Sequence, residues 1–334
     1  MRFSALGDVA MTVPVLRLVL EQNPSLRICM VSNRAYAPLF SSIERLTFVG
    51  ADLKGAHRGI IGLLKLYRAL HKAGPYRGIA DLHSVLRSQL LAFLFTISGT
   101  RSVRLNKGRA EKRKLTSRSH KELRQLPTAF ERMQAVFTAL GLSCHLPATT
   151  ATFASLAIAK SNYTIGIAPF ARHNEKAYPV SLLKELIAIL HADSRLTIQL
   201  VGGGGAEALA LAALEKEFAG VHSMAGRFSL AEELVLLGKL DLMISMDSAN
   251  MHLASLCNVP VISIWGATHR YAGFMGWGQP DHHAVEVSLS CRPCSVFGNK
   301  RCHRGDHACM QQIAPVAIAE KLYRVLGMAA PEQA

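Results

Sequence analysis

Two kinds of apolar pattern alternate along this chain. From Asp8 to Leu20 apolar residues recur every three or four positions, which predicts a helix that ends before Pro24. The short apolar run at residues 26–31 that follows predicts a strand. The alternation continues through the first half, with strands expected at 46–49 and 78–80 and helices at 60–71, 85–96 and 128–140.

The second half repeats the alternation more clearly. Apolar runs predict strands at 164–168, 196–201, 241–245 and 259–265, with a further candidate at 221–224. Helical spacing predicts helices at 181–191, 230–237 and 251–257, and a helix that follows the glycines at 202–205 and extends to Phe218.

Alternation of this kind is typical of parallel sheets covered by helices on both faces. We therefore expect an α/β protein with two Rossmann-like domains that face a central cleft. Residues 1–150 would form the first domain and residues 151–334 the second, with the last helix free to pack back on the first domain. Residues 143–159 are rich in small side chains and read as a linker with a candidate edge strand.

Composition narrows the class of protein. The chain has 334 residues, of which 50% are apolar and 18% charged, which excludes intrinsic disorder. The most apolar stretch, at 90–97, is too short to span a membrane. The first residues have no apolar signal core, which argues against export, so we expect a cytoplasmic enzyme.

Positive charge is concentrated in one segment. The formal net charge is +15, and ten Lys or Arg against two Glu give residues 101–124 a charge of +8. Such a segment attracts phosphate groups, an anionic membrane or an acidic ligand, or it is simply a solvated basic loop. The candidate ligand-binding residues here are Arg113, Lys114, Arg118, His120 and Lys121.

Polar residues follow several of the expected strands. Asp8 stands at a strand-to-helix corner, where it would either cap the helix or accept a proton in a cleft. Arg172 and Lys176 lie in a loop between a strand and a helix, where cations and helix amides bind phosphate, unless the loop is only solvated.

Two further strand ends carry candidate binding residues. The glycines at 202–205 formally match a dinucleotide-binding motif, but the next expected strand has no acidic residue to bind a ribose. Glu207 would either bind ribose hydroxyls itself or stabilise the start of its helix through the helix dipole. Asp247 and Ser248 open a helix whose free amides suit a pyrophosphate, with His252 one turn further on.

Seven cysteines are present. Four of them, Cys291, Cys294, Cys302 and Cys309, cluster near the end of the chain. The first two have the C-x2-C spacing of a metal site, and the second two have a looser spacing, so a structural zinc or other metal competes with paired thiols and simple packing.

Taken together, these segments resemble glycosyltransferase family 9, the ADP-heptose:lipopolysaccharide heptosyltransferases. The matching stretches fall in order over nearly the whole chain: RFSALGDVAMTVPVL, the loop around Lys176, VGGGGAE, AGRFSLAEE and SMDSANMHLASLCNVPVISIWGAT. Residues 291–309 and the following QQIAP resemble a segment of the heptosyltransferase II-like branch.

The resemblance implies a GT-B fold that binds the acceptor in the first domain and a nucleotide sugar in the second. It implies that Asp8 is the catalytic base, that Lys176 binds the donor diphosphate, and that the remaining donor contacts come from Arg172, Glu207, Phe228, Asp247, Ser248, Ala249 and His252. The reaction would be an inverting transfer that requires no cofactor, and the chain contains no Asp-x-Asp motif for a metal clamp. The acceptor would be a lipopolysaccharide core or lipid A precursor at the inner face of the inner membrane.

This sequence departs from the family pattern at three places. Only Met1 precedes Arg2, where the family has a full first strand; Ala249 replaces a glycine; and Phe170 or Ala171 stands where Thr or Ser is frequent. Another nucleotide sugar or acceptor therefore stays open within the family. Two other classes stay open as well: an NAD-dependent oxidoreductase, from the glycine run, and a zinc-bearing nucleic-acid binder, from the basic segment and the cysteines.

Overall fold

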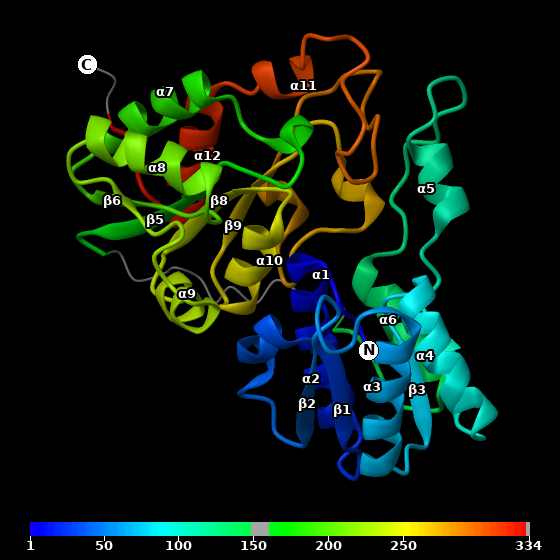
Figure 1. Cartoon of the computed structure of the whole chain (residues 1–334). Coiled ribbons are helices and arrows are strands. Elements are labelled where there is room, and N and C mark those ends of the chain that lie inside the picture. The colour runs from blue at the N-terminus through cyan, green and yellow to red at the C-terminus, as the bar shows by residue number, and fades with distance from the viewer. Residues whose placement is uncertain (148–159, 332–334) are drawn as a thin grey trace. The chain divides into compact units, whose positions relative to one another are not determined.

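The computed structural model describes residues 1–147 and 160–331, which divide into two units (Figure 1). Within these residues the first unit comprises Met1–Gly108 and 127–147, and the second comprises Arg109–Leu126 and 160–331. The basic segment Arg109–Leu126, expected within residues 1–150, is thus grouped with the second unit. Most of the expected linker at 143–159 lies outside the described residues.

The first unit contains every element expected from its sequence pattern, within a few residues of the expected bounds. The expected first helix is divided at Met11 into two helices, and a 3-10 helix and a fourth strand were not expected. The elements are α1 (Leu6–Ala10), α2 (Thr12–Gln22), β1 (Ile28–Asn33), η1 (Arg34–Phe40), β2 (Leu46–Ala51), α3 (Gly59–Ala73), β3 (Gly78–Asp81), α4 (Leu86–Ile97), β4 (Arg101–Arg104) and α6 (Ala129–Ala139).

The four strands of the first unit form two parallel pairs, β1–β2 and β3–β4. The first two residues of the chain connect these pairs. The Arg2 amide donates to the Val31 carbonyl at 3.1 Å, the Leu82 amide donates to the Met1 carbonyl at 3.1 Å, and the Met1 amino group donates to Ala80 at 2.7 Å. Beside this connection lies a cavity of about 680 Å³ that residues of both β1 and β3 line.

The second unit contains the strands and helices expected from 160 onwards, again with small shifts of bounds. Its elements are α5 (Arg109–Leu115), β5 (Tyr163–Ala168), η2 (Asn174–Lys176), α7 (Val180–His191), β6 (Leu196–Leu200), α8 (Ala206–Glu217), β7 (His222–Ser223), α9 (Leu230–Leu237), β8 (Leu242–Met246), α10 (Ala249–Leu256), β9 (Val261–Ile264), η3 (Arg270–Ala272), η4 (Asp281–His283), β10 (Ala284–Val285), α11 (Ala308–Gln311) and α12 (Pro315–Leu326).

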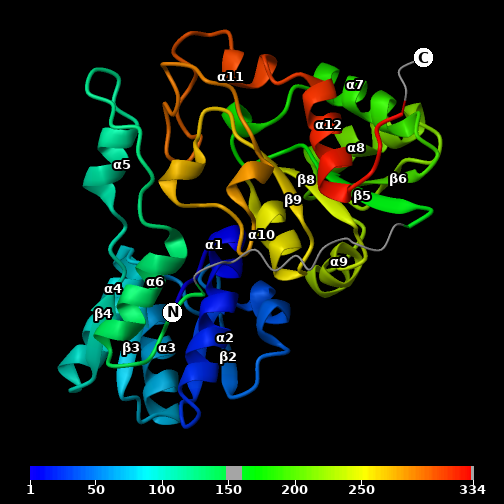
Figure 2. The same ribbon diagram turned by 180° about the vertical axis from the view of Figure 1, so that it is seen from behind.

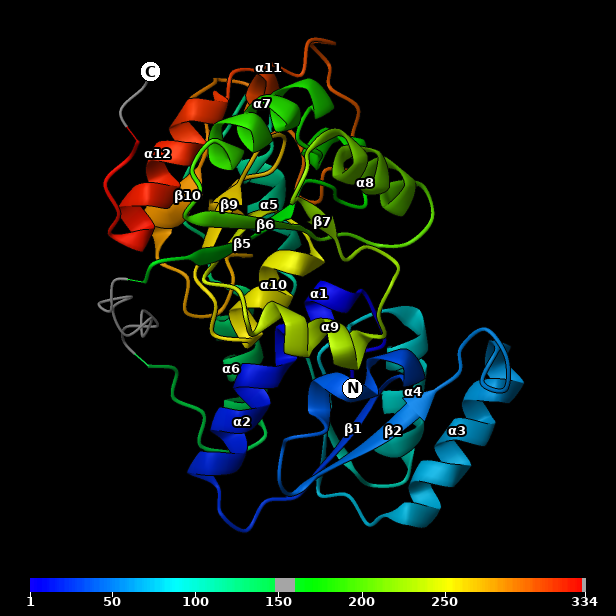
Figure 3. The same ribbon diagram turned by 90° about the vertical axis from the view of Figure 1, so that its left-hand side faces the viewer.

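The strands of this unit form one parallel sheet in the order β10-β9-β8-β5-β6-β7. The chain fills the sheet from β5 towards β7 and then returns to β8 on the other side of β5. Helices α7, α8 and α12 cover one face of the sheet, and α9 and α10 cover the other (Figure 3). The order reverses between β5 and β8, and in such sheets ligands bind at the carboxyl ends of the strands beside this reversal.

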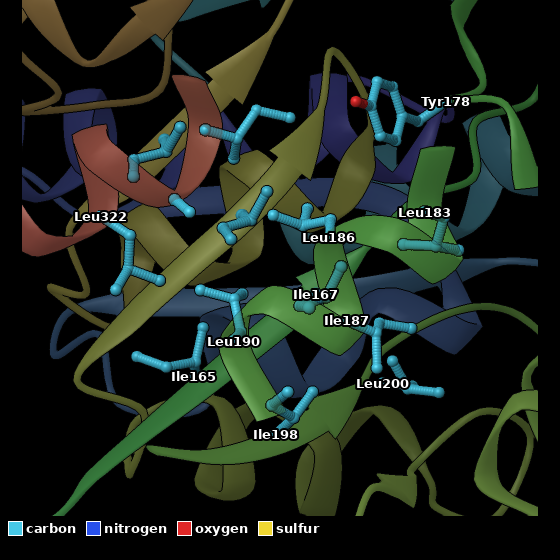
Figure 4. Close-up of a cluster of buried hydrophobic side chains, with 14 of the residues drawn as sticks. Ile165, Ile167, Tyr178, Leu183, Leu186, Ile187, Leu190, Ile198, Leu200 and Leu322 are labelled. Atoms are coloured by element: carbon cyan, nitrogen blue, oxygen red, sulfur yellow. The ribbon is translucent and has the colours of Figure 1, made fainter. Parts of the chain in front are cut away.

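Alternate residues of the strands form the core beneath α7. Ile165 and Ile167 of β5 contact the α7 residues Leu186 and Leu190, all at 1% exposure or less (Figure 4). Because each fully buried Leu or Ile contributes roughly 1.5–3 kcal/mol, this layer stabilises the sheet strongly. The last helix, α12, contributes Leu322 to the same core, so its packing partner is the second unit.

The basic segment is attached to the second unit by its apolar residues. Leu115 and Leu126 form a small buried cluster with Ala272, and the Leu126 amide donates to the Tyr271 carbonyl at 2.9 Å. Figures 1 and 2 show α5 beside the loop that precedes α11. In the described part of the chain, no helix combines the length and the apolar character needed to cross a membrane.

Candidate functional site

Two loops flank the reversal of strand order in the second unit, and each contributes one charged residue. Lys176 lies in the loop after β5, and Asp247 directly follows β8. The Lys176 Nζ lies 3.3 Å from the Asp247 Oδ2, with side chains 12% and 10% exposed. The two candidate residues are therefore paired in a largely buried setting, at the edge of the sheet where a ligand is expected.

Helix α10 begins directly after this pair. Ser248 is its N-cap residue, and its side chain makes no capping hydrogen bond; its Oγ lies 3.3 Å from the Ser245 Oγ. The first amides of α10 thus have no intrahelical acceptor and carry the positive end of the helix dipole. Ala249 begins the helix, half-buried, and His252 is buried one turn later.

The glycine loop after β6 is held by Glu207. Its Oε2 accepts a hydrogen bond of 2.8 Å from the Gly203 amide, so the carboxylate turns back over the loop at the start of α8. Gly205 has a φ of +67°, which favours glycine there. The carboxylate still has acceptor capacity for a ligand hydroxyl, as one hydrogen bond uses only part of it.

Phe228 and Arg172 are the exposed members of the candidate donor set. Phe228 is 45% exposed immediately before Ser229, which caps α9 through the Glu232 amide. An exposed aromatic ring next to a rigid helix start is suited to stacking on a planar base. Arg172 is exposed in the same loop as Lys176.

The loop that precedes α11 packs against the stem of Lys176. Gly298 has a φ of +74°, and a Cβ atom there would lie 2.4 Å from the Lys176 Cγ. The Ser295 hydroxyl accepts the Gly298 amide at 2.9 Å and so fixes this approach. The close approach positions the Lys176 ammonium, and the sequence pattern did not indicate it.

Asp8 lies in the first unit, in the first turn of α1. Its Oδ2 is 2.8 Å from Nη2 of Arg2 and 3.3 Å from the Ala5 amide, and the side chain is 33% exposed. The carboxylate thus both caps the helix from its third position and remains partly accessible. Arg2 also donates to the Leu82 carbonyl at 2.6 Å, which fixes the guanidinium beside Asp8.

The candidate acceptor residues of the basic segment differ in their surroundings. Arg113, Arg118 and His120 are exposed, and Lys114 pairs with Glu122 at 2.8 Å. Lys121 is instead a structural contact: its Nζ donates to the carbonyls of residues 290, 292 and 293 at 2.8–3.3 Å. Burial lowers the pKa of this ammonium.

The four clustered cysteines are free thiols in the structure. Burial raises the pKa of Cys309 to about 11 and also raises that of Cys294, which favours the protonated thiol. Across residues 1–147 and 160–331, no group of three or more His, Cys, Asp or Glu side chains is arranged to hold a metal ion. The geometry gives the expected metal site at Cys291, Cys294, Cys302 and Cys309 no support.

A buried ionic cluster near the site was missed by sequence reasoning. Arg292 donates to the carbonyls of Trp265, Gly266 and Thr268 at 2.6–3.1 Å, and so holds the loop after β9. Glu286 lies 3.1 Å from the Arg292 guanidinium. Burial alone would raise the pKa of Glu286, but the neighbouring His269 and arginines lower it. The one sequence signal for this cluster was the position of Arg292 between Cys291 and Cys294.

Comparison with known proteins gives a family. The model of the family described as glycosyltransferase family 9 (heptosyltransferase) matches residues 64–302. Lipooligosaccharide heptosyltransferase 2 of Campylobacter jejuni is 30% identical over 86 residues, so the match spans only 26% of that relative and 26% of this chain. Lipopolysaccharide core heptosyltransferase OpsX of Haemophilus influenzae is 23% identical over 282 residues, which cover 79% of this chain and 77% of OpsX.

Solved structures show the same fold. The structure described as E. coli heptosyltransferase WaaC with ADP has a TM-score of 0.67 at 19% identity, with 97% of this chain and 98% of that chain covered. A family 9 glycosyltransferase from Veillonella parvula has a TM-score of 0.73 at 17% identity, with 97% and 95% covered. The α/β fold with parallel sheets expected from the sequence is confirmed. The chain belongs to glycosyltransferase family 9, the heptosyltransferases.

Proposed function

We propose that this protein transfers a heptose from ADP-heptose to a sugar of a lipopolysaccharide inner-core acceptor. The observation that carries the proposal is the pairing of Lys176 with Asp247 beside the start of α10, at the reversal of strand order. A cation and free helix amides at this edge suit the diphosphate of a nucleotide sugar. OpsX and WaaC, which carry heptosyltransferase names, support the choice of sugar.

The donor would be bound by residues of the second unit. Lys176, Arg172 and the amides at Ser248 and Ala249 would neutralise the diphosphate, and Glu207 would accept hydrogen bonds from the ribose. The exposed ring of Phe228 would stack on the adenine. Asp247 would orient Lys176, and His252 would line the sugar end of the site.

The chemistry would be an inverting displacement without a metal ion. Asp8 would take the proton of an acceptor hydroxyl as its oxygen attacks the anomeric carbon, and the bond to the ADP oxygen would break. Charge then develops on the leaving diphosphate, where Lys176 and Arg172 would stabilise it. These fixed cations would serve the role that a divalent ion serves in enzymes with an Asp-x-Asp motif.

The acceptor would carry negative charge. The segment Arg109–Leu126 would attract a phosphorylated core saccharide through Arg113, Lys114, Arg118 and His120, and Lys121 would support the segment. The same positive charge would hold the protein against an anionic membrane surface on the cytoplasmic side.

A thermal-shift panel with ADP, ADP-heptose, UDP, GDP and NAD tests the donor. A ligand at 100 times its Kd stabilises the folded state by about 2.7 kcal/mol, so a bound nucleotide gives a clear rise in Tm. We expect a rise with ADP and ADP-heptose only. A rise with UDP or GDP in their place would change the donor, and a rise with NAD alone would contradict a nucleotide-sugar donor.

A further inference from the structure

A second cavity lies entirely within the second unit and is positively charged. It has a volume of about 350 Å³, and two segments far apart in the sequence line it: the end of α5 with the residues after it, and the loop before α11. The first segment contributes Arg113, Ser117 and Arg118, and the second contributes Lys300, Arg301 and His303. We call this cavity the basic pocket.

The cations of the basic pocket are not neutralised by the protein. No ion pair within the described chain joins a carboxylate to any of the four Lys and Arg residues of the pocket. Their sequence neighbours are paired: Arg124 with Glu122 at 3.7 Å, and Arg304 with Asp306 at 2.8 Å. Four cations without an ion pair in the described chain thus line one cavity.

Contacts outside the pocket hold its two walls together. The Lys121 ammonium donates to the carbonyls of Arg292 and Pro293, which begin the second wall. Lys112 lies 4.1 Å from the centre of the Phe274 ring, and Leu115 packs in the buried cluster beside it. The four cations are therefore brought together against their mutual repulsion by contacts that have no part in the cavity. A bound anion relieves that repulsion.

We propose that the basic pocket binds a phosphate group of a phosphorylated saccharide. The volume of about 350 Å³ leaves room for a sugar as well as its phosphate. Arginine guanidinium groups bind phosphate oxygens through paired N–H donors, and the Ser117 hydroxyl supplies a further donor. The claim that the bound phosphate belongs to a glycosyltransferase acceptor rests on the function proposed above. The claim that the basic pocket binds a phosphate group does not.

The proposal gives the loop before α11 a role. The cysteines of this loop were expected to hold a metal, and one of them, Cys294, lines the pocket together with Lys300 and Arg301. The loop carries these two cations to Arg113 and Arg118, which belong to a segment about 180 residues earlier in the chain. Neither segment alone forms the pocket.

Binding of pyrophosphate and of glucose 6-phosphate to the full chain, measured by calorimetry, tests the proposal. We expect Arg113→Ala and Arg301→Ala each to raise the Kd of glucose 6-phosphate at least tenfold, whereas pyrophosphate should also bind at the donor diphosphate site. Arg124→Ala and Arg304→Ala remove the same charge from paired positions next to the pocket and should change the Kd less than threefold. Lys176→Met separates this site from the donor diphosphate site, and it should leave glucose 6-phosphate binding unchanged.

Stability distinguishes a ligand site from a structural one. Without ligand, Arg301→Ala should keep or raise the Tm, because it removes repulsion, and it should lose the rise in Tm that glucose 6-phosphate produces in the unaltered protein. A lower Tm without ligand, together with unchanged binding, would overturn the proposal. So would glucose 6-phosphate binding that the paired-position variants weaken as much as the pocket variants.

Two further measurements identify the source of the phosphate and distinguish a failure of the basic pocket from a failure of the proposed function. Pocket-dependent binding to phosphatidylglycerol vesicles without binding of glucose 6-phosphate would overturn the saccharide in favour of a lipid headgroup. ADP binding is measured on Arg113→Ala, Arg301→Ala, Arg124→Ala and Arg304→Ala and should not change. Loss of the ADP response with an intact pocket would refute only the heptosyl donor, and an intact ADP response with no phosphate binding would refute only the pocket.

Discussion

The ammonium of Lys176 lies 3.3 Å from the carboxylate of Asp247, although 70 residues separate the two in the sequence. The pair joins the loops after β5 and β8, the two strands between which the order of the sheet reverses. A lysine held in this way has a fixed direction, which binding of a diphosphate needs.

Removal of the ammonium should weaken donor binding. We expect Lys176→Met to raise the Kd for ADP by about ten- to a hundredfold, since hydrogen bonds to charged groups contribute roughly 1.5–3 kcal/mol. Lys184→Met, which breaks a pair with Glu217 at 2.6 Å on α7, serves as the control and should leave the Kd unchanged. Equal effects of both variants in calorimetry would contradict a specific role for Lys176.

Gly298 offers a second way to disturb the same lysine. Gly298→Ala would place a Cβ atom 2.4 Å from the Lys176 stem, whereas Gly305→Ala in the same loop meets open space. Both glycines have positive φ, at 74° and 79°, so the backbone strain is matched. We expect Gly298→Ala alone to raise the Kd for ADP, by about three- to tenfold. Equal Kd values for the two variants would refute the packing argument.

Asp8 is proposed as the base, and its neutral isostere tests this role. Asp8→Asn should lower kcat by about a hundredfold or more, with ADP binding unchanged, because general bases contribute typically 10²–10⁴ in rate. Asp52→Asn, which alters a carboxylate 3.8 Å from Arg34 in the same unit, is the control. If Asp8→Asn folds normally and turns over at the original rate, Asp8 only caps α1.

Phe228 allows a test that leaves the fold intact. The ring is 45% exposed, so Phe228→Ala should change the free energy of unfolding little, while the Kd for ADP rises about tenfold through loss of base stacking. Phe93→Ala removes a ring that is 58% exposed on α4 and should change neither quantity. Chemical denaturation and calorimetry measure the two effects, and an unaltered Kd for ADP after Phe228→Ala would rule out stacking.

Two buried histidines predict how stability depends on pH. Burial lowers the pKa of His269 and of His283 to about 4. Below pH 6.5 the unfolded chain takes up a proton at each position, and the folded chain does so only near pH 4. The free energy of unfolding should therefore fall as the pH drops from 6.5 to 4, by on the order of 2 kcal/mol for each histidine.

Urea denaturation at pH 7.5, 5.5 and 4.5 measures this dependence. His283→Gln should flatten the decline by removing one titrating group, while His269 and His83, whose pKa burial also lowers to about 4, preserve part of it. A decline of the same steepness in the variant would show that other groups, such as carboxylates paired in the folded state, govern the acid limb.

The sequence predicted the fold well because its signals are local. The strand at β5 and the helix at α7 follow from runs and spacings within a dozen residues, and tertiary packing agrees with them. The candidate residues at strand ends were found by the same reasoning, since parallel strands bring their carboxyl ends to one edge.

Contacts between segments far apart in the chain were not predicted, because local sequence patterns carry no information about them. The approach of Gly298 to Lys176 and the role of Lys121 depend on segments more than 100 residues apart. The basic segment could be recognised by its charge, but nothing in the charge indicated that it is grouped with the second unit.

The connection between the two strand pairs of the first unit has a mechanical consequence. Three hydrogen bonds at Met1 and Arg2 join the β1 side of the unit to the β3 side, beside the cavity that residues of both strands line. Phe3 and Val31 also pack with Leu91 in one buried cluster, so side chains as well as hydrogen bonds hold the two strand pairs together. A load applied across the unit would therefore be shared between this cluster and the hydrogen bonds of Met1 and Arg2.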